Sequence, residues 1–154
     1  MGRASAEDSF AASVREAETL WYDTERWPEW VDGLRRMIAV EGDWPGAGAV
    51  VRWESTPAGR GRVVERVVDY APGRGQTLEV EDDSIRGRQT VAFYELEGGV
   101  RVELALEYEL KRRSIISPLV DALFIRRAMT DSLRSTLLRF GVEAAAAGAA
   151  GAAR

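Results

Sequence analysis

The last third of the chain contains its longest stretch with helical periodicity, from residue 117 to about residue 143. At roughly 100° per residue, one broad apolar stripe on this helix contains Ile116, Leu119, Leu123, Leu133 and Leu137. Pro118 and Asp121 are typical of a first helical turn. Arg126 and Thr130 interrupt the stripe near its centre. Because an arginine is almost never buried alone, we expect either a partner for Arg126 inside the fold or a helix face that borders a cavity.

Before that helix, the chain reads mostly as strands. Residues 100–110 alternate apolar and polar side chains almost perfectly, which predicts an antiparallel strand with one buried face. Further strands are predicted at residues 9–14, 34–41, 49–55, 62–70, 76–81 and 88–96. Two short helices are predicted after the first strand, at residues 15–22 and 27–31, with Pro28 at the start of the second.

This order of elements restricts the fold class. Without alternating strand and helix units, a parallel sheet is unfavourable, and the economical arrangement is one curved antiparallel sheet wrapped around the long helix. The sequence therefore predicts an α+β fold. A chain of 154 residues suits a single domain with a real core, which we place at residues 7–143. Residues 1–6 and the low-complexity residues 144–154 are expected to be disordered tails.

Composition excludes several partners. The net charge is −4 with no basic block, which argues against nucleic acid. The sequence contains no run of about 18 apolar residues, so no transmembrane segment is predicted. The N-terminal MGRASAEDSF has no apolar signal core. With no cysteine either, we expect a cytoplasmic protein. A single lysine among 21 basic residues, with abundant alanine and glycine, suggests a GC-rich bacterial genome.

Few groups remain for chemistry. The chain has no histidine, which removes the commonest general base and metal ligand, so a Ser-His-Asp site is excluded. Asp82 and Asp83 with Glu79 and Glu81 suggest a hard-metal site, but neighbouring strand residues point to opposite faces, which favours a solvated edge. The Gly46-x-Gly48 turn lacks a phosphate-binding pattern. We therefore expect no metal and no cofactor, and assign no catalytic residue.

Several motifs, in order along nearly the whole chain, resemble the START-like superfamily. They are Glu18-Thr19-Leu20-Trp21, Arg26-Trp27-Pro28-Glu29-Trp30, Gly46-x-Gly48, Ala71-Pro72-Gly73-Arg74 and Tyr94-Glu95-Leu96-Glu97-Gly98-Gly99. The likeness is greatest to the bacterial polyketide cyclase/dehydrase and lipid-transport group, also called SRPBCC or helix-grip proteins. One departure is Val100, where members often carry threonine. The resemblance implies a seven-stranded antiparallel sheet gripping the C-terminal helix, with a cavity between them for an apolar small molecule.

Candidate ligand-binding residues follow from the inward faces. The apolar face of residues 100–110 should point at the helix, and the family's pattern also points Tyr94 inward. The candidates are Trp53, Tyr94, Leu104, Leu106, Tyr108, Leu119, Leu123, Arg126 and Thr130. Aromatic walls with polar tips suit a ring-bearing or acyl ligand, although the same residues also serve to fill a core. Arg126 would pair with a ligand carboxylate or with a strand carboxylate such as Glu65.

Three functions remain open. The first is a carrier or sensor that binds a lipid, polyketide or aromatic-type ligand without catalysis. The second is a cyclase/dehydratase-like enzyme that uses tyrosine, arginine or carboxylate groups, and the lack of histidine makes it the less favoured of the two. The third is a protein-binding member of the superfamily. Phe124, Ile125 and Ala128 lie off the apolar stripe, so they predict a contact either with the short helices or with a second copy of the chain.

Overall fold

The structure is a computed structural model, which describes the backbone of residues 1–111 and 118–153 and the side chains of all of these except residues 118–121 and 152. Its elements are β1 (Gly2–Phe10), α1 (Val14–Trp21), the 3-10 helix η1 (Thr24–Arg26), α2 (Trp27–Trp30), β2 (Leu34–Glu41), β3 (Val50–Ser55), β4 (Arg62–Ala71), β5 (Gly75–Glu81), β6 (Ile85–Leu96), β7 (Gly99–Leu110) and α3 (Pro118–Ala152).

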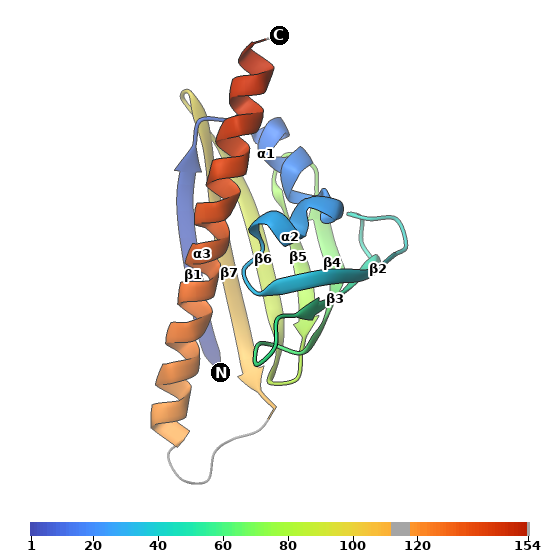
Figure 1. Ribbon diagram of the computed structural model, residues 1–154, viewed down its shortest axis with the longest axis vertical. Helices are drawn as coiled ribbons and strands as arrows, with labels where there is room; N and C mark the ends of the chain where they lie inside the picture. Colours follow the sequence, from blue (N-terminus) through green and yellow to red (C-terminus); the bar gives the residue numbers. More distant parts are fainter. Residues whose placement is uncertain (112–117, 154) are drawn as a thin grey trace.

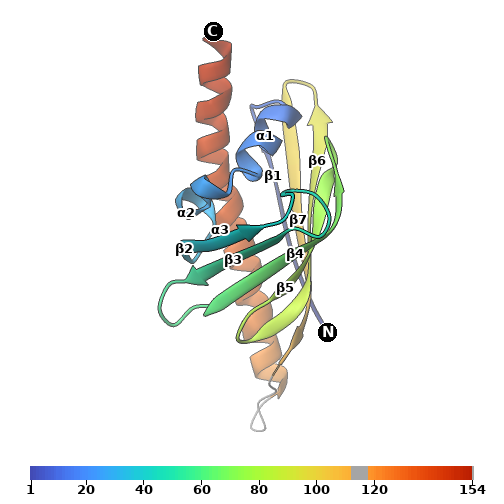
Figure 2. The same ribbon diagram turned by 90° about the vertical axis from the view of Figure 1, so that its right-hand side faces the viewer.

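The strands form one antiparallel sheet in the order β1-β7-β6-β5-β4-β3-β2. The long helix α3 packs along β1, and the short helices cross the same face of the sheet (Figure 1). Turned by 90°, the sheet curves around that face, with all the helices on its concave side (Figure 2). The predicted α+β helix-grip fold is confirmed, and the six strands predicted after the short helices lie within a few residues of their expected positions.

The first strand begins earlier than expected. We expected a disordered lead at residues 1–6 and a strand at residues 9–14, whereas β1 starts at Gly2 and pairs with β7 along its whole length. Its polar sequence gives little sign of this, because the backbone hydrogen bonds of the β7 pairing provide the order. The small side chains of Ala4 and Ala6 let α3 pack directly over the strand.

A capping box explains why the extended segment ends before residue 13. The Ser13 hydroxyl accepts from the backbone N–H of Glu16 at 3.1 Å, and the Glu16 carboxylate accepts from the backbone N–H of Ser13 at 2.9 Å. Two N–H groups that a helix start leaves without partners are satisfied in this way. Residues 13 and 14 therefore begin α1 instead of ending the first strand.

The C-terminal segment also differs from expectation, because α3 continues through the alanine-rich residues 144–152. Alanine is the strongest helix former, and this part of the helix lies against the connection between β1 and α1. A β-carbon at Gly148 would meet the carbonyl oxygen of Ala11 at 2.6 Å, so glycine allows the close approach. Ala144 is 1% exposed, which shows that the packing extends beyond residue 143.

The buried stripe of α3 differs from the expected one in the first half of the helix. Leu133 and Leu137 are buried as predicted, but Leu123 is 59% exposed. Ile125 and Met129 pack against the core in its place. Ile116 and the side chain of Leu119 lie outside the described residues.

Aromatic rings fill most of the space between the sheet and the helices. Trp21 of α1, Trp30 of α2 and Phe140 of α3 pack against one another, with ring centroids 4.7–5.1 Å apart. The indole N–H of Trp27 donates to the carbonyl of Trp21 at 2.8 Å. The contacts of Trp21 and Trp30 with Phe140 hold the short helices on α3.

The edge strand β2 is irregular. Its register against β3 shifts between Leu34 and Arg36 and again between Met37 and Ala39. Such bulges let the buried Leu34 and the half-buried Met37 both face the core, and they increase the local twist of the strand.

Candidate functional site

A small cavity of about 50 Å³ lies between the concave face of the sheet and the helices. Its apolar wall includes Trp21, Trp27, Trp30, Trp53, Leu104 and Leu133. Its polar lining includes Asp32, Arg60, Glu65, Gln89, Ser132 and Thr136. This volume has room for one or two water molecules or one functional group of a ligand, because a water molecule occupies about 30 Å³ in the liquid.

Glu65 is the buried carboxyl of this cavity. It lies on β4 between Val63 and Val67, and all three side chains point to the concave face by the alternation of the strand. Glu65 is 4% exposed, and its burial raises the pKa of the carboxyl from 4.5 to about 7. The charge of Arg60 and the indole N–H of Trp53 oppose this rise in part.

Polar groups around Glu65 are incompletely satisfied. Among the described residues, Glu65 Oε2, Trp53 Nε1 and Arg60 Nη2 are buried without a hydrogen bond of acceptable geometry, as is Trp30 Nε1 on the wall of the same cavity. The Arg60 guanidinium lies 5.5 Å from the centroid of the Trp53 ring. Most buried polar atoms in folded proteins have hydrogen-bond partners. A group of unpartnered polar atoms around one cavity therefore indicates a binding place for water or for a polar group of a ligand.

Arg60 is held in position by Asp82. Its Nε donates to Asp82 Oδ2 at 2.6 Å, and Asp82 Oδ1 accepts from the backbone N–H groups of Ser84 and Ile85 at 2.8 and 2.9 Å. The Asp82 side chain is fully buried. The expectation of a solvated edge therefore holds for Glu79 and Glu81, which are exposed, and is wrong for Asp82, because the turn before β6 folds it inward onto Arg60.

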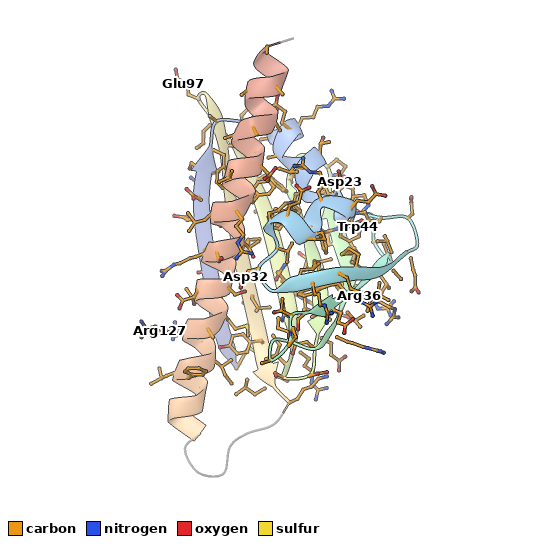
Figure 3. All side chains as sticks on the ribbon, in the orientation of Figure 1. Asp23, Asp32, Arg36, Trp44, Glu97 and Arg127 are labelled. Atoms are coloured by element: carbon orange, nitrogen blue, oxygen red, sulfur yellow. The ribbon has the colours of Figure 1, made fainter. Side chains whose placement is uncertain are left out.

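Asp32 fastens the segment after α2 to α3, beside the cavity. Its backbone N–H donates to Thr136 Oγ1 at 3.0 Å, and its carboxylate accepts from Ser132 Oγ at 2.8 Å. Arg139 adds an ion pair, with Nη2 3.6 Å from Asp32 Oδ1. Figure 3 shows Asp32 against α3. We call this group of contacts the Asp32 clasp.

The predicted site residues on β3 and β7 face inward. Trp53 and Leu104 line the cavity, and Leu106 and Tyr108 are buried on the same face. Their contact with a ligand stays a prediction.

Tyr94 was assigned to the wrong face. It is 42% exposed on the convex side, where the Arg101 guanidinium lies 4.6 Å from its ring centroid. Val91 and Phe93 take the inward positions of β6, with Phe93 opposite Val102 of β7. Both faces of this strand carry apolar residues, so its alternation is ambiguous, and a shift of one residue exchanges them.

Arg126 does not reach into the fold. Its side chain is exposed, and no ion pair to it occurs within residues 1–111 and 122–151. Its carbonyl accepts from Thr130 Oγ1 at 2.9 Å, so the half-buried Thr130 is satisfied by its own helix. Glu65 is a buried polar group on the cavity that α3 also lines, and the sequence indicated it only as a possible partner of Arg126. A charged residue between two valines of an alternating strand was the available signal.

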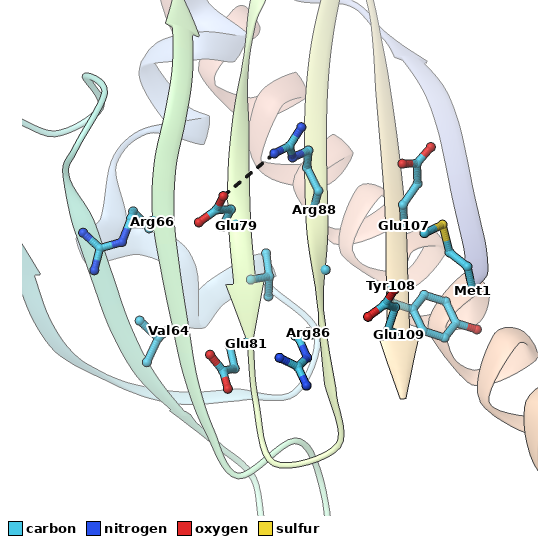
Figure 4. A pocket seen from close by; sticks show the side chains of 12 residues that line it. Met1, Val64, Arg66, Glu79, Glu81, Arg86, Arg88, Glu107, Tyr108 and Glu109 are labelled. Atoms are coloured by element: carbon cyan, nitrogen blue, oxygen red, sulfur yellow. Dashed lines mark ion pairs between the residues drawn. The ribbon is translucent and has the colours of Figure 1, made fainter. Parts of the chain in front are cut away.

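The convex face of the sheet carries a wider, charged hollow of about 470 Å³, whose lining includes Arg66, Glu79, Arg88 and Glu107 (Figure 4). Around it, arginines and glutamates alternate on neighbouring strands. For example, Arg88 Nη2 on β6 lies 3.8 Å from Glu79 Oε1 on β5. No group of three acidic side chains suited to a metal ion occurs in the described part of the chain. In the hollow, each arginine named has a glutamate on a neighbouring strand, whereas the Glu65 carboxyl in the cavity has an oxygen without a partner.

Comparisons with known proteins support the fold. The chain is similar to a Thermus thermophilus protein of known crystal structure, with 24% identity over 94% of this chain and 98% of that one, at a TM-score of 0.79. It is also similar to truncated norcoclaurine synthase from Thalictrum flavum, with 13% identity, 90% of each chain covered and a TM-score of 0.65. The di-domain ARO/CYC StfQ of the steffimycin biosynthetic pathway matches with 18% identity and a TM-score of 0.70, and this chain, 92% covered, spans half of it.

A comparison with curated protein sequences gave no match. In the described residues, no helix is both long and apolar enough to cross a membrane. The family model for polyketide cyclase/dehydrase and lipid transport proteins matches residues 1–144, which is nearly the whole chain. Together with the seven-stranded sheet that curves around α3, this match shows that the chain belongs to the polyketide cyclase/dehydrase and lipid transport family, with a START-like fold.

Proposed function

We propose that this chain binds an apolar, ring-bearing small molecule between the concave face of its sheet and α3, as a carrier or sensor in the cytoplasm. The observation that carries the proposal is Glu65, a buried carboxyl with an unpartnered oxygen in a cavity walled by tryptophan indoles. The family, whose fold suits binding of hydrophobic ligands or cyclase activity, supports it.

A purely structural role does not account for Glu65. Removing a carboxyl from water without a full set of partners destabilises a fold, and an apolar side chain of similar size in that place is usually at least as stable. Val63 and Val67 on the same face of β4 illustrate that alternative. Buried groups with shifted pKa values are concentrated at functional sites.

The size of the cavity restricts how a ligand binds. Pockets for drug-sized ligands measure roughly 300–1,000 Å³, far more than the 50 Å³ between sheet and helices. A ring-bearing ligand therefore needs a neighbouring element to move. The Asp32 clasp joins the segment after α2 to α3 through a few polar contacts, so its release is one way to widen the cavity.

The test is binding of an uncharged apolar fluorophore, N-phenyl-1-naphthylamine, to the folded protein. We expect one site with a Kd in the micromolar range. Leu104→Trp fills the cavity and should weaken binding at least tenfold. Ala105→Trp adds the same side chain to the outer face of β7 and should leave the affinity within about twofold. Equal effects of the two variants, or no binding to the folded wild type, would contradict the proposal.

Catalysis is the second candidate, favoured by one observation. A carboxyl whose pKa is raised to about 7 suits general acid-base work near neutral pH, and Glu65 has an unpartnered oxygen for it. The reaction class would be cyclisation or dehydration of a polyketide. Glu65→Gln should then abolish turnover of a poly-β-ketone thioester while fluorophore binding persists. Turnover that survives in this variant would exclude Glu65 as the acid-base group.

Association with a partner or a second copy of the chain is a separate proposal for the outer side of α3. Phe124 is 73% exposed and Ala128 is also exposed, which suits a contact surface. Ile125 faces the core instead and does not belong to that surface.

A further inference from the structure

Three of the four unpartnered atoms on the cavity lining belong to Trp53, Arg60 and Glu65 and form a set with a definite chemistry, and the fourth is Trp30 Nε1 on the wall. Trp53 Nε1 and Arg60 Nη2 are donors, and Glu65 Oε2 is an acceptor when the carboxyl is ionised. The three groups lie close together, because Arg60 stands over the Trp53 ring and both influence the Glu65 carboxyl. A ligand group that satisfies all three therefore accepts two hydrogen bonds and donates one.

Most common ligand groups fail this requirement. A carboxylate accepts twice but donates nothing, and it would bring a second negative charge beside Glu65. An ammonium donates to Glu65 but has no acceptor for the indole and guanidinium N–H groups. A hydrocarbon leaves all three atoms buried and unsatisfied. A hydroxyl group has one donor and two acceptor lone pairs, which is the complement of the set.

We propose that the polar end of the cavity, formed by Trp53, Arg60 and Glu65, binds the hydroxyl group of an uncharged aromatic ligand. In this arrangement the hydroxyl oxygen accepts from Trp53 Nε1 and Arg60 Nη2, and its proton is donated to Glu65 Oε2. The ion pair between Arg60 Nε and Asp82 Oδ2, 2.6 Å apart, holds the guanidinium in place before a ligand binds. The 50 Å³ of the cavity accommodate the hydroxyl and the adjoining ring edge, and the surrounding tryptophans contact the ring.

This inference rests on the proposed function, since it specifies the ligand of the same cavity. The experiment compares 2-naphthol, naphthalene and 2-naphthoate as competitors of N-phenyl-1-naphthylamine at about pH 8, where Glu65 is mostly ionised. We expect 2-naphthol to bind at least tenfold more tightly than naphthalene, and 2-naphthoate to bind the weakest of the three.

Single substitutions test which side chains cause the preference for 2-naphthol over naphthalene. Trp53→Phe keeps a ring but removes a donor, and should reduce the preference for 2-naphthol over naphthalene to threefold or less. Trp44→Phe is the matched control, because the Trp44 indole N–H already donates to the carbonyl of Tyr22 at 2.8 Å, outside the cavity lining. It should keep the full preference. Glu65→Leu removes the acceptor together with a buried charge, so it should fold at least as well as wild type while losing the preference.

The outcomes separate the two proposals. If naphthalene and 2-naphthol displace the fluorophore equally well from wild type, the hydroxyl inference is wrong and the proposed function stands. If the preference persists in both Trp53→Phe and Glu65→Leu, the hydroxyl lies elsewhere and the inference is again wrong. If the fluorophore does not bind at all, the proposed function itself fails.

Discussion

The two faces of the same sheet handle charge in opposite ways. Across the convex face, one row of residues on neighbouring strands alternates in sign through five positions, which are Arg3, Glu107, Arg88, Glu79 and Arg66. Every charge in this row has an opposite charge beside it and water above it. The concave face carries Glu65, buried, with one oxygen unpartnered and its pKa raised to about 7.

The difference shows that the exposed charges of the convex face are compatible with a stable fold, whereas the buried carboxyl of Glu65 lowers its stability. Cross-strand pairs on an exposed face contribute little each, and any of them is replaceable. A single carboxyl among aromatic rings makes the fold less stable at neutral pH, and the proposed ligand would supply the partner that it lacks.

The largest difference should come from exchanging one aromatic residue on each face for alanine. Trp53, 1% exposed, lies in the core, whereas Tyr94 is 42% exposed. Trp53→Ala should lower the free energy of unfolding by about 3–5 kcal/mol, because it removes contacts and leaves a void. Tyr94→Ala should lower it by about 0.5 kcal/mol. Urea denaturation measures both, and similar losses would mean that Tyr94 is more buried in solution.

Replacement of the buried carboxyl should change how stability depends on pH. Because the pKa of Glu65 is about 7 in the folded state and 4.5 when unfolded, the folded state binds the extra proton between these values. Wild type should therefore lose about 3 kcal/mol as the pH rises from 4.5 past 7, a loss that Glu65→Gln avoids. The variant's stability relative to wild type should rise by that amount between about pH 4.5 and pH 8.

The control for this measurement is Val63→Ala, which alters the next inward position of β4 without changing any titratable group. Its stability relative to wild type should be the same at both pH values. If Glu65→Gln behaves in the same way as Val63→Ala, the Glu65 carboxyl is not isolated from water, and the contrast between the faces disappears.

The smallest effect is expected in the convex row. Glu79→Arg places three arginines in succession on β4, β5 and β6, and should lower stability by about 0.5 kcal/mol at low salt, less at high salt. Adding Arg88→Glu restores a favourable pair and should recover part of the loss. A loss above about 2 kcal/mol would show that the row does more for the fold than exposed pairs usually do.

The fold was largely predictable because its signals are local. Alternation on β7, the order of strands before one long helix, and the motifs around Trp27 and Trp30 all persist in the structure. Register was harder to read. On β6 both faces carry apolar residues, so Tyr94 was placed inside, and on α3 the mixed apolar pattern placed Leu123 in the stripe.

The site was less predictable because it depends on contacts between distant residues. Arg60 and Asp82 are 22 positions apart, and Asp32 meets Ser132 and Thr136 across about 100 positions. Nothing local marks such partners. The extended conformation of β1 was hidden for the same reason, since pairing with β7 imposes it on a sequence of low strand propensity.

The two register shifts of β2 have a consequence for how copies of this chain behave when crowded together. The outermost strand of an open sheet presents unpaired N–H and C=O groups, and a straight, regular one can template strand addition from another molecule. In β2 the shifts at Arg36 and Ala39 disturb that row, and Arg35 and Arg36 add exposed positive charge along it. At the opposite border, α3 lies along β1. The β2 border of the sheet therefore offers no regular strand edge for β-aggregation.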